Sequence, residues 1–548
     1  MKPSLAFILL VLLLFSCTGV SADAQASGTS GIVSSAHPLA TEAGLRILKS
    51  GGNAFDAAVA IAAALNVVEP DMSGMGGYGT ILVYDAAKKE TRFLNPSGRI
   101  PASLDSDAFR APTPGYEENR RGAKSVSTPG NVHGWEQLSR NYGRLPWKDL
   151  FARAIELAEA GFPISDRLQK SIASAFRSFP DWARRDYGRG DTPLGSGEIL
   201  IQKNLANSLR RVAAGGAKEF YEGEIARAID SAMRGRGGFL SAKDLASDRA
   251  EWWKPIQISY RGHKIVTASP PANTFDYLVR LGIMSRFDVS ALGLNSVRYL
   301  HRFAEATKHG FWVRLRHAGD PEINPPPLER LLSQQYWKEE ADKIDPEKAR
   351  PFVPPVAFGD GSRHTTHFVV ADHWGNVVSA TQTLGNAFGA RIMPEGTGIW
   401  LNNSLAYCTF EPKGNPMDAH AGRRKLSGDC PTIILRDGRP WVALGTPGGH
   451  TIGQTVPQIV MNLIDFKLDV GQAIAAPRVS FYEPDSLGVE NGIPANVRDQ
   501  LAKMGHRVRV VSGIGNAHAL MIEYDRQNKP IRFTAAADPR GEGKALGF

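Results

Sequence analysis

Two hydroxyl side chains and two imidazoles stand together in the stretch His364-Thr365-Thr366-His367-Phe368. A threonine hydroxyl attacks a carbonyl carbon when a nearby base takes its proton. Alternatively, His364 and His367 could hold a metal ion together with Asp372 and His373. Residues three apart on a strand point to opposite faces, which counts against a shared metal. The stretch therefore predicts a threonine nucleophile and no metal site.

A glycine-rich turn is a second feature that could bind a ligand, Ser73-Gly74-Met75-Gly76-Gly77-Tyr78-Gly79. Glycine clusters cradle phosphate when they open a helix, whose N-terminal amides attract anions. Here the apolar run from Thr80 to Tyr84 follows, and it has the character of a strand. We therefore predict that these glycines allow close backbone packing rather than phosphate binding.

The motif around Thr365 belongs to an ordered set that resembles the gamma-glutamyltransferase family of N-terminal-nucleophile hydrolases. In that family a Thr-Thr-His-aromatic strand begins the small subunit of a precursor that cleaves itself. Each further mark is weak alone, but their order over most of the chain is specific. These marks are Ile47-Leu48-Lys49-Ser50-Gly51-Gly52-Asn53-Ala54-Phe55-Asp56-Ala57-Ala58-Val59-Ala60, Ser127-Thr128-Pro129-Gly130, Leu401-Asn402-Asn403, Cys430-Pro431-Thr432-Ile433, Gly445-Thr446-Pro447-Gly448-Gly449, Ala476-Pro477-Arg478 and Asp538-Pro539-Arg540.

The resemblance implies self-cleavage between His364 and Thr365 and four catalytic residues. Cleavage gives Thr365 a free α-amine, which titrates at about 7.7–8.0 and can take the proton of the neighbouring hydroxyl. Thr383 matches the family's second threonine, whose hydroxyl bonds the nucleophile; an ordinary strand-face residue is the alternative. The backbone N–H groups of Gly448 and Gly449 match the oxyanion hole. This chemistry requires no cofactor.

The clamp that holds a glutamyl group in the family is poorly matched. Family members bind the α-carboxylate with an arginine and two serines, and the α-ammonium with an asparagine, a glutamine and an aspartate. Ser97 stands at the arginine position, and only Ser427 remains of the serine pair because Gly428 replaces the second. An unpaired buried charge is costly, so the ordinary glutamyl pose is doubtful. The three ammonium ligands are replaced by Gly385, Ser404 and Tyr407.

Three residues are candidate replacements for anchoring an anion. They are Arg99, which lies two residues from Ser97, Arg391, and His450, which follows the oxyanion glycines. For each of them a surface or structural role is an equal alternative.

Three functions stay open for this chain. The first is a gamma-glutamyl hydrolase or transferase with a rebuilt clamp, because the family acts on gamma-glutamyl compounds such as glutathione. The second is an amidase for another small-molecule amide; relatives without the clamp process oxamate and acylated beta-lactam side chains. The third is a non-catalytic exported binding protein on the same fold. The intact Thr365, Thr383, Gly448 and Gly449 argue against the third.

The elements that must position these residues follow from the hydrophobic pattern. Ala40 to Leu48 and Ala54 to Val68 have helical character, and the region 147–349 is mainly helical in pattern. Residues 350–361 are rich in proline and glycine and predict an exposed connector. Two strands follow at 366–372 and 377–383. The resemblance implies an α+β fold, a four-layer αββα sandwich with two antiparallel sheets inside.

Composition bounds the class of protein. The chain has 548 residues, of which 42% are hydrophobic and 22% charged, as in ordinary globular proteins. The net charge of +9 comes from dispersed basic residues, and no motif predicts a nucleic-acid partner. Beyond the leader, Cys408 and Cys430 are the two cysteines, and a disulfide and two buried thiols are equally compatible with the sequence.

The N-terminus has the pattern of an export leader. Lys2 precedes an apolar run from Leu5 to Phe15 with small residues after it, and this run is too short to span a bilayer comfortably. We predict a signal peptide at 1–26, a large subunit at 27–364 and a small subunit at 365–548, joined in one catalytic unit. No later segment predicts a transmembrane span. A periplasmic or secreted location follows, and a lipid anchor at Cys17 is an alternative.

Overall fold

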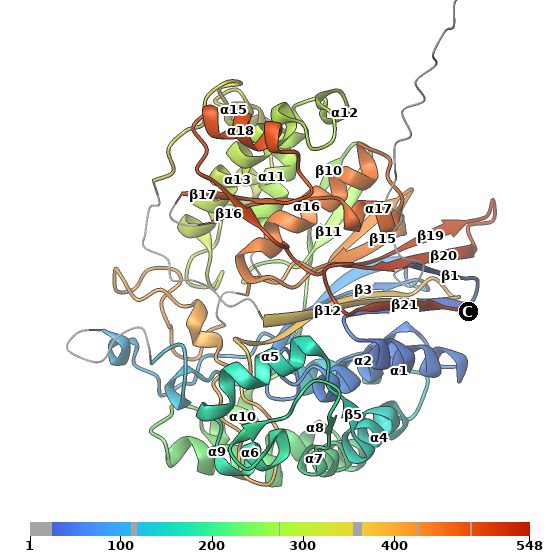
Figure 1. The fold of residues 1–548 in the computed structure, drawn as a ribbon. Helices are drawn as coiled ribbons and strands as arrows, with labels where there is room; N and C mark the ends of the chain where they lie inside the picture. The colour runs from blue at the N-terminus through green and yellow to red at the C-terminus, as the bar shows by residue number, and fades with distance from the viewer. Residues whose placement is uncertain (1–24, 111–117, 273, 354–363, 425–426, 483–484) are drawn as a thin grey trace, which may run out of the picture.

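The computed structural model describes residues 25–110, 118–272, 274–353, 364–424, 427–482 and 485–548 (Figure 1). Cys17, residues 1–24 of the predicted leader and residues 354–361 of the predicted connector lie outside these ranges. Gln25 and Ala26 already belong to strand β1 (Gln25–Gly28), which pairs with β20. Leader removal before Gln25 would keep this strand whole. Within the described ranges no helix has the length and hydropathy needed to cross a membrane.

Two seven-stranded sheets lie face to face between two layers of helices, which confirms the predicted α+β sandwich (Figure 1). Both sheets are antiparallel throughout. We call one sheet the nucleophile sheet, because its strand β12 carries Thr365, the predicted nucleophile. Its strand order is β21 (Lys544–Gly547), β2 (Gly31–Ser35), β12 (His364–Asp372), β13 (Val377–Gly385), β3 (Tyr78–Asp85), β4 (Glu90–Asn95) and β9 (Glu251–Trp253). The second sheet has the order β1, β20 (Pro530–Ala537), β19 (His518–Tyr524), β15 (Arg439–Gly445), β14 (Thr432–Arg436), β11 (His263–Thr267) and β10 (Ile256–Tyr260).

Strand β12 lies in the middle of the nucleophile sheet and is buried on both faces. Side chains alternate between the faces of a strand. Val369 and Ala371 pack between the two sheets, whereas Phe368 and Val370 pack towards the helices. This double burial explains the apolar run after the two threonines, and it fixes the register of the strand that carries Thr365.

The helices on the nucleophile sheet include α1 (Pro38–Lys49) and α2 (Ala54–Val68), which lie where the sequence predicted helices. Asn53 begins α2 with a capping box. The Asp372 carboxylate at the end of β12 accepts a hydrogen bond from the Ala54 N–H at 2.8 Å. The buried start of α2 is therefore tied directly to the nucleophile strand.

The other helical layer covers the second sheet and includes α11 (Phe275–Met284), α13 (Val297–His317) and α16 (Ile452–Ile464) (Figure 1). The prediction that 147–349 is mainly helical is confirmed for most of this region, but it missed strands. β9, β10 and β11 lie within it and extend both sheets. β10 exposes alternate residues, a period of two that the surrounding helical pattern obscured.

The glycine-rich turn before β3 packs against backbone, as predicted. A Cβ atom on Gly76 would lie 2.1 Å from the Trp400 carbonyl oxygen, and one on Gly77 would lie 2.5 Å from that of Thr383. Such contacts leave no room for a side chain. These glycines therefore bring β3 close to the strand that carries Thr383.

Cys408 and Cys430 are buried thiols that are not joined in a disulfide. Cys408 packs in a small apolar cluster with Phe109 and Phe410, whereas Cys430 belongs to the large cluster over the second sheet. The thiol alternative is therefore the one that the structure adopts.

Candidate active site

Thr365 lies at the start of β12 with its hydroxyl bonded to a second threonine. The Thr365 Oγ1 donates to Thr383 Oγ1 at 3.2 Å, and Thr383 Oγ1 donates in turn to the His364 carbonyl oxygen at 2.5 Å. Both threonines are buried, with 3% and 1% of their surface exposed. The structure thus places the proposed nucleophile, its partner and the carbonyl group of the proposed scissile bond in one hydrogen-bonded chain.

The hairpin of β12 and β13 produces this geometry. Its register shifts between His364 and Thr366, so Thr365 lies at an irregularity rather than in a regular pair. Gly385, at a φ of 101°, ends β13 and donates its N–H to Thr383 Oγ1 at 2.8 Å. The Thr383 hydroxyl is consequently held by three neighbours.

An ionic network underlies the nucleophile. Thr366 Oγ1 donates to Glu69 at 2.7 Å, and Arg167 pairs with Glu69 at 3.3 Å and with Asp71 at 2.9 Å. Burial raises the pKa of Glu69 to about 7, although Arg167 opposes the rise. Because Thr366 follows the nucleophile directly, this network fixes the backbone at Thr365.

Among the described residues, His364, His367, Asp372 and His373 do not form a group of possible metal ligands. His367 bonds Thr381 Oγ1 at 2.8 Å, and burial lowers its pKa well below the usual value. Asp372 accepts backbone N–H groups, including those of Trp374 and Asn376. His373 stacks near Trp374.

One group of possible metal ligands occurs in the part of the chain that the structure describes, and it lies away from the nucleophile. It consists of His301, Glu305 and His506. The Glu305 carboxylate is already paired with Lys308 at 2.8 Å and with Arg350 at 3.3 Å. Because Lys308 and Arg350 already pair with Glu305, the only acidic residue of the group, a metal ion is disfavoured at this site.

Strand β15 of the second sheet runs towards the start of β12. The Leu444 carbonyl accepts a bond from Ser379 Oγ at 3.1 Å, and Ser379 is paired with Val369 of β12. The next residue, Gly445, lies against the ring of His367, where a Cβ atom would come within 2.2 Å. The turn after β15 therefore lies at the end of the sandwich where Thr365 begins its strand.

That turn contains Gly448 and Gly449, at φ angles of 138° and 58°. Both values lie in the left-handed region that favours glycine. The turn opens the short helix η6 (Gly449–Thr451) and then α16. Neither glycine N–H donates to another residue that the structure describes. Two free amides at a helix start can receive a developing oxyanion.

Ser427 lies beside this glycine turn and is buried. Its Oγ accepts the Asp429 N–H at 3.3 Å. A Cβ atom on the adjacent Gly428 would lie 3.5 Å from the Gly449 carbonyl and 3.9 Å from the Tyr407 ring. The structure thus brings Ser427 and Tyr407, two residues at predicted clamp positions, close to the predicted oxyanion glycine Gly449.

The structure describes the side chain of Arg99 but not that of His450. The Arg99 guanidinium pairs with Glu251 at 2.7 Å and donates to the Gly422 carbonyl at 3.2 Å. This pairing favours the structural alternative for Arg99. The backbone of His450 lies in η6, but its side chain is outside what the structure describes.

Arg391 lines a cavity of 590 Å³ that reaches His364. We call it the basic cavity, because five of its lining residues are basic and one is acidic. Arg391, at a φ of 59°, follows the loop after β13, and its guanidinium donates to Ser178 Oγ at 2.9 Å. The charged lining residues are Asp71, Arg120, Arg121, Arg167, Lys170 and Arg391.

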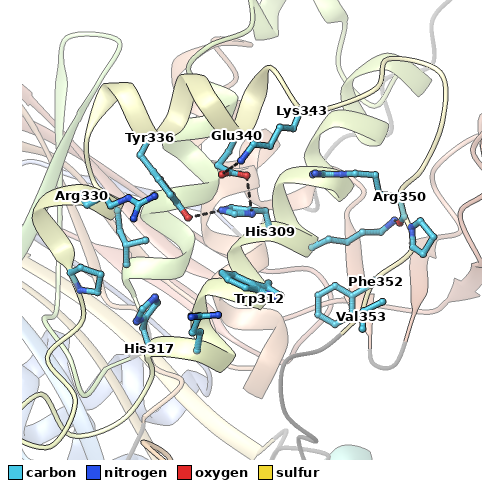
Figure 2. Close-up of a pocket in the computed structure, with 15 residues that line it drawn as sticks. His309, Trp312, His317, Arg330, Tyr336, Glu340, Lys343, Arg350, Phe352 and Val353 are labelled. Atoms are coloured by element: carbon cyan, nitrogen blue, oxygen red, sulfur yellow. Dashed lines mark hydrogen bonds and ion pairs between the residues drawn. The ribbon is translucent and has the colours of Figure 1, made fainter.

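A larger cavity of 710 Å³ lies elsewhere, between α13, α15 (Gln334–Ala341) and residues 350–353 (Figure 2). We call it the aromatic cavity, after Trp312, Tyr336 and Phe352. None of its lining residues comes from β12, β13 or the glycine turn. It is therefore separate from the nucleophile despite its size.

Sequence reasoning missed several residues around the nucleophile. Glu69 and Arg167 lie far apart in the sequence, and no motif links them to Thr366. The Arg120-Arg121 doublet was visible as a local concentration of charge, but its position beside His364 depends on the fold. Tyr78, the register partner of Thr383, was hidden in the glycine-rich turn.

Comparison with known proteins agrees with this arrangement. Residues 40–548 match the gamma-glutamyltranspeptidase family model. The chain is 34% identical to a glutathione hydrolase proenzyme of Bacillus subtilis strain 168, over 95% of this chain and 92% of that protein. It is 36% identical to an acylase ACY 1 proenzyme of Pseudomonas sp. strain V22, over 89% of this chain and 90% of that protein.

A solved structure shows the same fold. The cephalosporin acylase of Bacillus halodurans superposes with a TM-score of 0.88 at 30% identity, covering 98% of this chain and 99% of that chain. The family match and the relatives cover both the strand of Thr365 and the glycine turn. This chain belongs to the gamma-glutamyltranspeptidase family of N-terminal-nucleophile amidohydrolases.

Proposed function

We propose that the chain cleaves itself before Thr365 and then hydrolyses small-molecule amides through a Thr365 acyl-enzyme. The observation that carries this proposal is the bonded chain from Thr365 Oγ1 through Thr383 Oγ1 to the His364 carbonyl. It contains a nucleophile, an orienting hydroxyl and a polarised carbonyl. The relatives named as proenzymes support the self-cleavage.

Self-cleavage uses the bond that the structure shows intact. The Thr365 Oγ1 attacks the His364 carbonyl carbon, and Thr383 stabilises the oxygen that gains charge. The C–N bond breaks as the Thr365 nitrogen takes the proton that Oγ1 released, which leaves an ester between the His364 carbonyl carbon and Thr365 Oγ1. Water hydrolyses that ester, so His364 ends in a carboxylate and Thr365 begins with an amine.

The same atoms then act on a substrate amide. The free amine of Thr365 takes the hydroxyl proton while Oγ1 bonds the substrate carbonyl carbon. The N–H groups of Gly448 and Gly449 receive the oxyanion. The amine passes the proton to the leaving nitrogen, the C–N bond breaks, and water resolves the ester into a free acid. An amine in place of water would give acyl transfer.

Substrate choice divides into two candidates. A gamma-glutamyl compound such as glutathione is supported by the hydrolase relatives, whereas a different acyl amide is supported by the acylase relatives. Ser427 and Arg391 are the substrate-binding residues that the geometry favours, with His450 a further candidate. Arg99 is a weaker candidate because Glu251 already pairs with it.

We also propose export to the periplasm or the medium, with lipid attachment at Cys17 as the alternative. The leader pattern supports this location. Mass analysis of the first residue of the large subunit tests it: a start near Gln25 indicates soluble export, and an acylated Cys17 indicates anchoring.

Substitution of the nucleophile tests the catalytic proposal. Thr365→Ala should give one uncut chain on a denaturing gel and no hydrolysis of glutathione, gamma-glutamyl anilide or other acyl anilides. Thr365→Ser is the matched control, because it keeps a hydroxyl and should still be cut. Two subunits from Thr365→Ala would place the nucleophile elsewhere.

A further inference from the structure

The basic cavity is held in place beside the nucleophile by hydrogen bonds between three segments. Asn403 links two of them, since its Nδ2 donates to the Arg120 carbonyl at 2.6 Å and its Oδ1 accepts the Asn386 N–H at 2.8 Å. The Gly122 N–H donates to the Ala390 carbonyl at 3.0 Å. These bonds place Arg120 and Arg121 next to the loop that leads from Thr383 to Arg391.

The cations of this cavity are mostly uncompensated. Asp71, the one acidic lining residue, pairs with Arg167, which also contacts Glu69 and Glu542. Among the residues that the structure describes, no carboxylate lies within ion-pair distance of Arg120, Arg121, Lys170 or Arg391. Desolvation and the nearby charge of Arg121 lower the pKa of Arg391. Four cations that face one cavity without counter-charges form an environment suited to an anion.

The same surroundings are unfavourable for an ammonium group. The positions that hold the glutamyl ammonium in the family carry Gly385, Ser404 and Tyr407, none of which is an acid. Ser404 is itself engaged, because its hydroxyl bonds that of Ser127. In the uncut chain, an ammonium near the basic cavity would meet four like charges and no free carboxylate among the cavity's described lining residues.

We infer that the basic cavity is a subsite for a substrate arm that carries two or more negative charges and no ammonium group. Its volume of 590 Å³ is ample for a small polycarboxylate. The contact of the cavity with His364 places such an arm next to the amide that Thr365 attacks. This inference rests on the proposed amidase function and names its substrate class.

Three anilides that differ at one carbon test the inference. All are para-nitroanilides built on glutaric acid: glutaryl itself, gamma-glutamyl, which adds an ammonium, and a third with a second carboxylate in place of that ammonium, which gives a dicarboxylate arm. The dicarboxylate arm should have the highest kcat/KM and the gamma-glutamyl arm the lowest, with a ratio of at least about tenfold. A preference for the gamma-glutamyl compound would overturn the inference.

Variants that each remove one cation of the basic cavity test whether the preference for the dicarboxylate anilide depends on that cavity. Lys170→Gln and Arg391→Gln should each reduce the preference for the dicarboxylate anilide over the uncharged pentanoyl anilide about threefold or more. Lys170 is exposed, so its variant is expected to fold. Arg330→Gln, in the aromatic cavity, is the matched control and should leave the preference unchanged. Equal preference in all variants would contradict the assignment.

A binding measurement separates this inference from the amidase proposal. Calorimetry on the purified wild-type protein can follow binding of the free tricarboxylic acid that corresponds to the third anilide. Binding that Lys170→Gln weakens, in a protein that hydrolyses no anilide, would uphold the subsite and overturn the amidase proposal. Hydrolysis of the pentanoyl anilide in preference to both the glutaryl and the dicarboxylate anilide would overturn the subsite and uphold the amidase.

Discussion

The basic and aromatic cavities are both lined by cations, but they differ in how those cations are paired. In the aromatic cavity Lys308 and Arg350 pair with Glu305. Lys343 pairs with Glu340 (Figure 2). In the basic cavity Arg120, Arg121, Lys170 and Arg391 have no such partners among the described residues. The smaller cavity also reaches His364, whereas the larger one does not.

This difference shows that volume is a poor guide to a catalytic site. The charge of a paired cation is already compensated within the fold, whereas an unpaired cation beside the proposed nucleophile can bind an anionic ligand. Arg316 and Arg330 of the aromatic cavity lie over the rings of Trp312 and Tyr336, which gives them packing partners instead of acids. The basic cavity differs from the aromatic cavity in its unpaired cations and in its contact with His364, the residue before Thr365.

The largest effect is expected from removing the Thr383 hydroxyl, which bonds both Thr365 and His364, a lining residue of the basic cavity. Thr383→Val keeps the shape of the side chain but loses the bonds to Thr365 and His364. Self-cleavage and turnover should each fall by about a hundredfold or more. Time courses on denaturing gels and an anilide assay measure both rates. Wild-type cleavage in this variant would show that Thr383 is only a strand residue.

The glycine turn provides the next largest effect. A Cβ atom on Gly448 would lie 2.3 Å from Thr451 Oγ1, at a φ of 138° that other residues avoid. Gly448→Ala should displace the oxyanion amides and lower kcat about a hundredfold. Gly438→Ala is the matched control, because Gly438 has a φ of 77° and no atom near its missing Cβ. Similar losses in both variants would indicate general backbone strain.

The network below the nucleophile predicts a pH effect on stability. The pKa of Glu69 is raised from 4.5 to about 7 in the folded protein. The folded state then holds the proton more tightly than the unfolded state, so stability falls as the pH rises from about 4.5 to 7 and is level above that. The loss is on the order of 3 kcal/mol.

Glu69→Gln should remove this loss, because an amide does not titrate. Chemical denaturation of both proteins at several pH values measures the slope. The difference between wild type and variant should change through this window and be constant above it. A difference that is independent of pH would show that Glu69 is ionised throughout.

The smallest effect is expected in the aromatic cavity. Arg330→Gln alters a cation that lies over Tyr336, in a cavity that no residue of β12 or β13 lines. Cleavage and turnover should stay within about twofold of the wild type. Steady-state kinetics on the acyl anilides checks this. A large loss of activity would mean that the two cavities are coupled.

The sequence predicted the fold and the strands that carry Thr365 and Thr383 better than it predicted the basic cavity. The helix at Ala54–Val68 and the strands of Thr365 and Thr383 carry strong local patterns, so their positions were predictable. The strands at 251–267 were missed because they are short and lie among helices. The basic cavity unites residues 120, 170 and 391, which only tertiary structure brings together. The ion pair with Glu251 favours a structural role for Arg99. The sequence did not predict this pair because Glu251 lies in one of the missed strands.

The identity of the first residue of the small fragment tests the central claim most directly. Intact-mass and N-terminal sequence measurement of the purified active protein should show two fragments, the smaller one covering 365–548 and starting with a free Thr365. A single continuous chain that still hydrolyses amides, or a small fragment that begins at another residue, would contradict the account.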